Sequence, residues 1–192
     1  MAPVPDIAAL AEALAPTLGT HVAEATASVM ICLREGERGT EILLCRRATR
    51  EGDPWSGHVG LPGGGVDAAD ADSLATAARE TLEEVGFDPR QRGRILGMLE
   101  PLVPRSFPIV IAAYVAHITA EVELDLSEEI AVAWWTPFED LAWVSAEVPE
   151  APTRVSAYRI PHPEAQDVVL WGITYRLLDR LFRVTETTSP AE

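Results

Sequence analysis

The stretch that decides the fold is LPGGGVDAADADSLATAARETLEEVGF, residues 61–87. It joins a glycine-rich loop to a segment from Asp72 to Val85 that is predicted to be a helix, with Asp70 or Asp72 as its N-cap and Gly86 as its stop. At 100° per residue, one side of this helix is mostly apolar and is expected to face a core. The residues on that side are Leu74, Ala77, Ala78, Thr81, Leu82 and Val85.

The opposite side of the predicted helix carries Glu80, Glu83 and Glu84, at i, i+3 and i+4. Carboxylates this close repel one another by roughly tenths of a kcal/mol per pair. A hard cation such as Mg²⁺ or Mn²⁺ reverses that cost, because these ions prefer oxygen ligands. The glycines upstream let backbone groups approach an ion or a phosphate closely. The alternative is a solvated acidic face, with Arg79 and Glu83 as a simple i,i+4 pair.

The segment resembles the Nudix box, with the pattern G-x5-E-x7-R-E-U-x-E-E-x-G-U, where U is a bulky apolar residue. The matching residues are Arg79, Glu80, Glu83, Glu84, Gly86 and Phe87. Thr81 departs from the pattern at an apolar position, where its methyl group can still pack. Counted from Gly65, Ala71 replaces the isolated glutamate; counted from Gly64, Asp70 stands there and the box holds one extra residue. In this family the isolated acid is chiefly structural or auxiliary.

The resemblance implies a Nudix fold: an α/β/α sandwich of the α+β class, with a mixed β-sheet between helices. It implies that Mg²⁺ or Mn²⁺ is bound by the three glutamates and the carbonyl of Gly63, with Gly64 shaping the turn. Arg79 would pair with one of the glutamates and hold the cluster in place. The implied reaction is Mg²⁺-dependent hydrolysis of a nucleoside diphosphate linked to another group, in which the ion lowers the pKa of the attacking water.

The residue that accepts the proton from this water differs among Nudix enzymes. Glu83 and Glu84 are candidates, as are the distal acids Glu128 and Glu129 in the loop before Ile130. For the last pair, a solvated hairpin tip is an equally good interpretation.

The residues just before the box resemble the coenzyme A pyrophosphatase branch, which Gly57-His58-Val59 and Asp67 fit. However, Gly52 stands where that branch has an arginine, and Leu61 replaces a phenylalanine. The insert GDPWSG resembles nucleoside diphosphate sugar hydrolases. We therefore expect a nucleoside diphosphate sugar or ADP-ribose as the substrate, with coenzyme A as the alternative. An alternative of another class is a catalytically inactive Nudix domain that senses a nucleotide or binds a protein.

Further residues are candidates for substrate binding, each with an ordinary structural alternative. Arginines near the loops can bind phosphate bidentately, or they can be surface charges. His58, between glycines, can lie at the substrate edge, while Trp55 and Tyr158 can stack on a base or pack locally. His21, His117 and His162 have no ligand spacing, so no zinc site is expected. The candidate substrate-binding residues are Arg46, Arg47, Arg50, His58, Gly64 and Arg105.

The flanking segments predict one domain at residues 23–184, preceded by a helical extension at 1–22 and followed by a flexible tail at 185–192. Apolar runs predict strands, amphipathic runs predict helices, and the proline-rich segment from Pro149 to Pro163 is expected to wrap the surface. The predicted strands are Ala23–Leu33, Glu41–Arg46, Ile95–Val103, Ile109–His117, Val122–Leu126 and Ile130–Trp135. The predicted flanking helices are Ile7–Leu14 and Val169–Phe182, with a short turn of helix at Pro137–Leu141.

Composition limits the classes of function. The 192 residues are 47% hydrophobic and 23% charged, with a formal net charge of -15. Such a charge repels phosphate backbones, so nucleic-acid binding is not expected. No secretory signal or apolar stretch long enough to span a bilayer is seen, and Cys32 and Cys45 lie in apolar runs typical of buried thiols. We expect a cytoplasmic enzyme without a membrane partner, for which a homodimer is one option.

Overall fold

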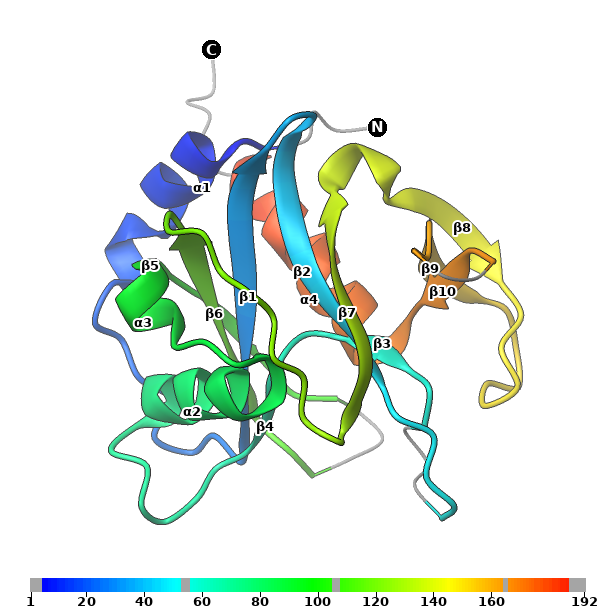
Figure 1. The fold of residues 1–192 in the computed structure, drawn as a ribbon, viewed down its shortest axis with the longest axis horizontal. Helices are drawn as coiled ribbons and strands as arrows, with labels where there is room; N and C mark the ends of the chain where they lie inside the picture. The colour runs from blue at the N-terminus through cyan, green and yellow to red at the C-terminus, as the bar shows by residue number, and fades with distance from the viewer. Residues whose placement is uncertain (1–4, 53–55, 105–107, 164–165, 187–192) are drawn as a thin grey trace.

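The computed structural model describes residues 5–52, 56–104, 108–163 and 166–186 (Figure 1). The helices are α1 (Ile7–Leu14), α2 (Ser73–Val85), α3 (Pro89–Arg92) and α4 (Gly172–Val184), with 3-10 turns η1 (Ala15–Thr17) and η2 (Phe138–Asp140). The first strands are β1 (Ala27–Gly36), β2 (Gly39–Arg47), β3 (Val59–Gly60), β4 (Gly63–Gly65) and β5 (Gly93–Leu102). The later strands are β6 (Ile111–Ile118), β7 (Ile130–Pro137), β8 (Ala142–Ala146), β9 (Val155–Ile160) and β10 (Val168–Leu170).

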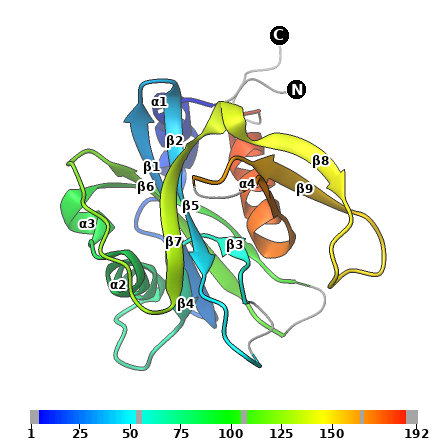
Figure 2. The same ribbon diagram turned by 45° about the vertical axis from the view of Figure 1, so that its right-hand side comes forward.

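The strands form two sheets. The larger sheet has the order β3-β2-β1-β6-β5, with β4 also paired to β1 and β7 also paired to β2. β1 and β6 run parallel, whereas the other pairs in this sheet are antiparallel, so the sheet is mixed. A smaller antiparallel sheet, β10-β9-β8, stands beside it (Figure 2).

The central strands alternate between two apolar cores. Ile31 and Leu33 of β1 belong to the core that also holds residues of α1 and α4. Met30 and Cys32 of the same strand point to the other face, where they pack with Ala77 of α2. Because successive side chains of a strand point to opposite faces, this puts helices on both sides of the sheet. The predicted mixed α/β/α arrangement is confirmed.

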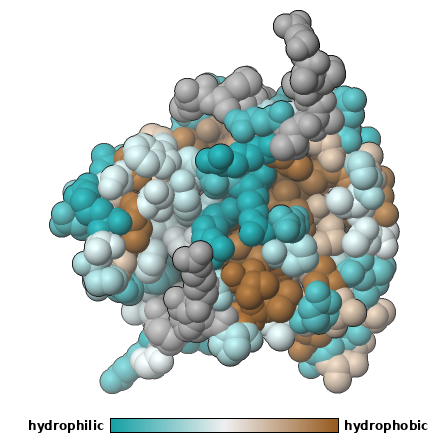
Figure 3. Space-filling model, turned by 180° about the vertical axis from the view of Figure 1, so that it is seen from behind, coloured by the Kyte–Doolittle hydropathy of each residue, from teal (hydrophilic) through white to brown (hydrophobic). Residues whose placement is uncertain are grey.

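The surface of the molecule seen from behind carries a band of hydrophilic side chains beside apolar ones (Figure 3).

Helix α2 is fixed at both ends by the expected residue types. Of the two N-cap candidates, Asp72 takes the role, and its carboxylate accepts a hydrogen bond from the Ala75 N–H at 2.8 Å. Gly86 ends the helix in the left-handed conformation, at φ 85°. The buried hydroxyl of Thr81 donates to the Ala77 carbonyl at 2.7 Å, which satisfies the polar atom at this apolar box position.

The strand predicted at Val122–Leu126 is wrong, because this segment is irregular. Its backbone hydrogen bonds go to the end of α2 and not to a neighbouring strand. The Asp125 N–H donates to the Val85 carbonyl at 3.2 Å, and the Ser127 N–H donates to the Glu84 carbonyl at 3.1 Å. These carbonyls lie in the last turn of the helix, where backbone acceptors lack helical partners.

The segment Pro149–Pro163 does more than wrap the surface. It contains β9, whose Tyr158 and Ile160 are buried in the core beside α4. The final helix begins at Gly172, later than predicted, because Val168–Leu170 pairs with β9. The consecutive apolar residues Val168, Val169 and Leu170 did not distinguish a short strand from the first turn of a helix. Residues 187–192 of the expected tail lie outside the described residues.

The N-terminal helix α1 packs against the body of the molecule. Its Ile7, Leu10 and Leu14 are buried in the same core as α4. The following Thr17 hydroxyl accepts a hydrogen bond from the Met98 N–H of β5 at 2.8 Å. The helix and η1 therefore lie against the β5 edge of the larger sheet.

Candidate active site

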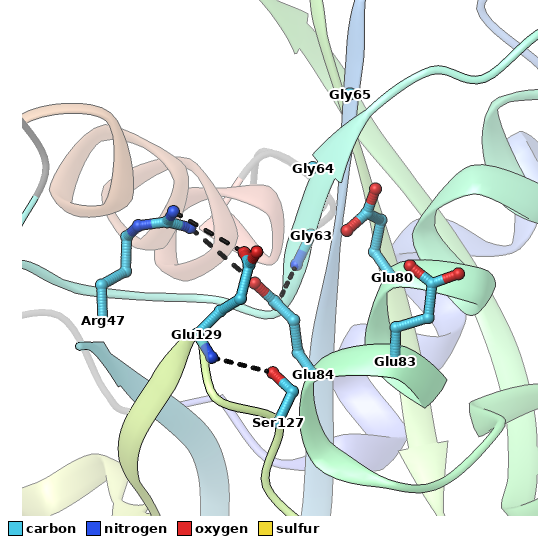
Figure 4. Close-up of a pocket in the computed structure, with 9 residues that line it drawn as sticks. All are labelled: Arg47, Gly63, Gly64, Gly65, Glu80, Glu83, Glu84, Ser127 and Glu129. Atoms are coloured by element: carbon cyan, nitrogen blue, oxygen red, sulfur yellow. Dashed lines mark hydrogen bonds and ion pairs between the residues drawn. The ribbon is translucent and has the colours of Figure 1, made fainter. Parts of the chain in front are cut away.

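One pocket gathers half of the charged residues that the sequence singles out. It has a volume of about 550 Å³ and opens between α2, β4 and the turn before β7 (Figure 4). Carboxylates from α2 and from that turn face it, together with glycine backbone and one arginine. Its lining residues are Arg47, Gly63, Gly64, Gly65, Glu80, Glu83, Glu84, Ser127 and Glu129.

Glu84 is the most buried carboxylate of this pocket, at 6% exposure. It accepts a hydrogen bond from the Gly63 N–H at 2.9 Å, and Arg47 lies 3.9 Å away. Burial, with further repulsion from Glu80 and Glu129, raises the pKa of Glu84 to about 7, although the Gly63 N–H and Arg47 act in the opposite direction. Burial is the main cause, so Glu84 holds its proton more tightly than an exposed glutamate does.

Arg79 ties the acidic face of α2 to the loop before it. Its guanidinium binds both carboxylate oxygens of Asp70 at 2.9 Å. It also donates to Glu80 at 2.9 Å and to Glu83 at 3.1 Å. The Asp70 side chain is 6% exposed, and Arg79 holds the pKa of this carboxyl well below its usual range. Asp70 therefore occupies the place of the isolated acid in the box, with Arg79 as its partner.

The glycine loop comes close to these carboxylates because it has no side chains. Gly63–Gly65 forms β4 and pairs antiparallel with Ala27–Val29 of β1. A Cβ atom on Gly64 would stand 2.5 Å from the carboxyl carbon of Glu80, well inside contact distance. The Gly65 carbonyl accepts a hydrogen bond from Arg79 at 3.0 Å. A side chain at position 64 would therefore require the Glu80 carboxylate to move.

The turn before β7 brings Glu129 into the pocket and leaves Glu128 exposed outside it. The Glu129 carboxylate lies 3.8 Å from Arg47 and 3.4 Å from Arg50. Its backbone N–H donates to the Ser127 hydroxyl at 3.3 Å (Figure 4). Sequence reasoning missed Ser127, whose only signal was its position just before the two glutamates.

The candidate residues for substrate binding are not all brought together. Arg47 lines the pocket, and Arg50 reaches it through Glu129. Arg46 turns away and donates to the Gly57 carbonyl at 3.3 Å. His58 lies 3.6 Å from Glu150, with its ring 5.5 Å from that of Trp171. Arg105 and Trp55 lie outside the described residues, and Tyr158 is buried in the core.

The donor set of the pocket suits a hard divalent cation in its chemistry. Four carboxylates and the glycine backbone supply oxygen atoms, which Mg²⁺ and Mn²⁺ prefer. In the described part of the chain, however, no three His, Cys, Asp or Glu side chains are already arranged around one ion position. Arg79 holds the carboxylates of Glu80 and Glu83, which explains this.

The family follows from a match over most of the chain. The family model described as the NUDIX domain matches residues 24–158. The chain belongs to the Nudix family. Nudix hydrolases act on phosphoanhydride bonds and generally use divalent metal cations. The Nudix box lies within the matched residues, and its Arg79, Glu80, Glu83 and Glu84 are the residues described above.

Curated relatives of this Nudix chain include proteins from three eukaryotes. An uncharacterized protein of Schizosaccharomyces pombe is 38% identical over 59% of this chain and 35% of its own length. Nudix hydrolase 22, chloroplastic, of Arabidopsis thaliana is 29% identical over 86% of this chain and 57% of its own length. The mitochondrial coenzyme A diphosphatase NUDT8 of Mus musculus is 33% identical over 49% of this chain and 43% of its own length. This chain thus spans between about a third and just over half of each.

A solved structure shows the same fold. The Nudix hydrolase RenU of M. smegmatis aligns with a TM-score of 0.58 and 15% identity, over 88% of this chain and 90% of that chain. Among the described residues, none of the helices is long and apolar enough to cross a membrane.

Proposed function

We propose that this Nudix protein is a Mg²⁺-dependent pyrophosphatase that hydrolyses the diphosphate of a nucleoside diphosphate linked to another group. The observation that supports this best is the convergence of Glu80, Glu83 and Glu84 on one pocket with the glycine strand β4. A catalytically inactive Nudix domain would have no need to keep all three carboxylates beside the Arg79–Asp70 pair.

In this proposal, Glu80, Glu83, Glu84 and the carbonyl of Gly63 hold Mg²⁺, or Mn²⁺. Bound there, the ion would supply charge neutralisation of the diphosphate oxygens and a lowered pKa of the attacking water. Arg79, which binds Asp70, Glu80 and Glu83, positions the glutamates. The approach of Glu84 to the Gly63 backbone, 2.9 Å from its N–H, supports this assignment.

Glu129 is the proposed proton acceptor, and Glu128 is not. Glu129 lines the pocket opposite α2, whereas Glu128 lies outside it. Arg47 and Arg50 lie 3.8 and 3.4 Å from the Glu129 carboxylate and position it at the pocket. Glu83 and Glu84 are assigned to the ion in this scheme.

The proposed substrate is a nucleoside diphosphate sugar or ADP-ribose. Arg47, which lines the pocket, and Arg50, 3.4 Å from Glu129, are the proposed contacts to the diphosphate. The 3′-phosphate of coenzyme A requires further cationic contacts, and Gly52 supplies none. Coenzyme A is the second candidate, because the mouse relative is named a coenzyme A diphosphatase.

A panel of substrates tests both parts of the proposal. The values of kcat/KM for UDP- and GDP-sugars, ADP-ribose and coenzyme A are compared at one Mg²⁺ concentration and again in EDTA. Product masses in ¹⁸O-labelled water identify the phosphate that is attacked. We expect Mg²⁺-dependent release of a nucleoside monophosphate, with sugar substrates preferred. A preference of about a hundredfold for coenzyme A, near 2.7 kcal/mol, would reverse the substrate ranking. If none of the substrates is hydrolysed, the assignment as an active enzyme is overturned.

A cytoplasmic location and the lack of nucleic-acid and membrane partners stay predictions. The first is supported by Cys32 and Cys45, which are both buried free thiols. The Arabidopsis and mouse relatives are named as organellar proteins, so localisation of the tagged chain in its own cells is the direct test.

A further inference from the structure

The turn before β7 is held against the end of α2 by backbone hydrogen bonds. The Asp125 N–H donates to the Val85 carbonyl at 3.2 Å, and the Ser127 N–H donates to the Glu84 carbonyl at 3.1 Å. A Cβ atom on Gly86 would stand 2.6 Å from the Cβ of Asp125, so the turn lies directly on the helix end. Because the side chain of Glu84 lines the pocket, its carbonyl fixes the position of Ser127 relative to the pocket carboxylates.

The backbone of Glu129 is held on both sides of its Cα atom. Its N–H donates to the Ser127 hydroxyl at 3.3 Å (Figure 4), and its carbonyl accepts from the Ala48 N–H, just after β2, at 2.8 Å. The Ser127 carbonyl in turn accepts from the Ile130 N–H at 3.1 Å, which closes the turn. With both backbone groups bonded, the Cα–Cβ bond of Glu129 keeps one direction, and in this direction the carboxylate lines the pocket.

The Ser127 hydroxyl is the one side-chain group in this set of hydrogen bonds. The other bonds join backbone atoms, so nearly any residue type at position 127 keeps them. The side-chain contacts of Glu129 are long in comparison. Its carboxylate lies 3.8 Å from Arg47 and 3.4 Å from Arg50, whereas tight charge-assisted bonds measure roughly 2.7–2.9 Å. The direction of the Glu129 side chain therefore depends on its backbone, and this backbone depends on the hydroxyl at position 127.

We propose that Ser127 is a positioning residue for the reaction, which holds the Glu129 carboxylate where it can take the proton of the attacking water. The proposal rests on the proposed function, in which Glu129 is the proton acceptor. Proton transfer requires the two heavy atoms to lie about 2.6–3.2 Å apart. Without the hydroxyl, the Glu129 N–H loses its partner, and the carboxylate spends less time at that distance. The chemical step slows, while the groups proposed to hold the ion and the diphosphate stay in place.

Solvent exchange of the Glu129 amide, measured by NMR in the metal-free chain, tests the hydrogen bond directly. Ser127→Ala should speed this exchange roughly fivefold, as expected for the loss of one hydrogen bond. Ser127→Thr keeps a hydroxyl at the same position and should preserve the slower rate. The matched control is Ser145→Ala, which removes an exposed hydroxyl that binds Arg154 at 3.2 Å, and should leave the Glu129 amide unchanged. Thermal melts check that all three variants are folded.

Steady-state kinetics with Mg²⁺ and the best substrate of the panel measure the effect on the reaction. Ser127→Ala should lower kcat about tenfold and leave KM and the Mg²⁺ concentration for half-maximal activity unchanged, because the lost contact acts on the chemical step alone. Ser127→Thr should recover most of kcat, and Ser145→Ala should match the unaltered chain. A loss confined to KM would mark Ser127 as a contact to the substrate and would overturn the proposal.

A double-mutant cycle with Glu129→Gln tests whether Ser127 acts through Glu129. Glu129→Gln should lower kcat about a hundredfold or more, the range for a lost general base. Ser127→Ala should then cause no further loss, since the carboxylate through which it acts is gone. Losses that multiply in the double variant, or a Glu129 amide whose exchange Ser127→Ala leaves unchanged, would overturn the proposal.

The cycle also separates the role of Ser127 from the assignment of Glu129. If Glu129→Gln lowers kcat and Ser127→Ala does not, only the role of Ser127 is overturned. If Glu129→Gln leaves kcat unchanged, Glu129 is not the proton acceptor, and the role of Ser127 is overturned with it.

Discussion

Helix α2 and the described residues 46–52 and 56–60 both supply candidates for the site, yet these candidates behave differently. All three glutamates of α2 line the pocket. Of Arg46, Arg47, Arg50 and His58, only Arg47 lines it directly. Residues at i, i+3 and i+4 share one face of any helix, so their convergence follows from local geometry. Residues in a strand end and a loop converge only if the tertiary structure arranges it, and here it turns Arg46 and His58 elsewhere.

The largest expected effect on activity comes from a substitution in helix α2. Glu84→Gln preserves size and removes one ligand charge, so kcat/KM should fall by about a thousandfold or more, near 4 kcal/mol of transition-state stabilisation. Steady-state kinetics at saturating Mg²⁺ measure this change. The matched control is Glu128→Gln, which alters an exposed carboxylate outside the pocket and should leave activity unchanged. If Glu84→Gln turns over substrate nearly as fast as the unaltered chain, the α2 glutamates do not form the catalytic site that the comparison assumes.

A smaller loss is expected where the helix meets its loop. Asp70→Ala leaves Arg79 with Glu80, Glu83 and the Gly65 carbonyl, so the glutamates are held less firmly and kcat/KM should fall about tenfold. Asp67→Ala, in the same loop, removes an exposed carboxylate that caps the Ala69 N–H and serves as the control. If Asp70→Ala is as severe as Glu84→Gln, Asp70 is a ligand or a catalytic group and not a support for Arg79.

The neighbouring residues Arg46 and Arg47 allow the comparison to be made between two side chains of the same type. Arg47→Ala should raise KM about tenfold with a smaller change in kcat, since one bidentate phosphate contact is lost, at about 1.4 kcal/mol. Arg46→Ala removes the same type of side chain from the neighbouring position and should change KM little, because Arg46 binds the Gly57 carbonyl. Equal effects of the two substitutions on KM would show that Arg46 also reaches the substrate.

The smallest expected effect is a change in the folding stability of the chain with pH. The pKa of Glu84 is raised to about 7 in the folded chain, from an ordinary value of 4.5. The folded state therefore holds this proton more tightly than the unfolded state. The resulting stability is fully present below about pH 4.5 and is lost as the pH rises through about 7.

In EDTA, the melting temperature of the unaltered chain relative to Glu84→Gln should thus fall by about a few degrees between pH 5 and pH 8. Excess Mg²⁺ at pH 8 should raise the melting temperature of the unaltered chain more than that of the variant, because the ion binds the folded state. Calorimetry that shows a constant difference across this pH range would contradict the burial of a charged Glu84.

The sequence predicts best what local geometry determines. Helix α2, its Asp72 cap and its Gly86 stop are confirmed because each depends on residues a few positions apart. The small sheet was missed because Val155–Ile160 forms a strand only when Ala142–Ala146 and Val168–Leu170 lie on either side of it. Likewise, Ser127 enters the pocket because its N–H binds the end of α2 at Glu84, a contact between segments that the chain alone does not reveal.

The position of α1 has a consequence for the order of folding. Its Ile7, Leu10 and Leu14 share a core with Leu177, Leu178 and Leu181 of α4. The apolar faces of the first and last helices described are thus completed by partners distant in sequence, and contacts of this kind close late because long chain segments must be ordered first. During synthesis, the apolar side of α1 is covered completely only after α4 has left the ribosome, so nascent chains that stop short of α4 should be the species that chaperones bind.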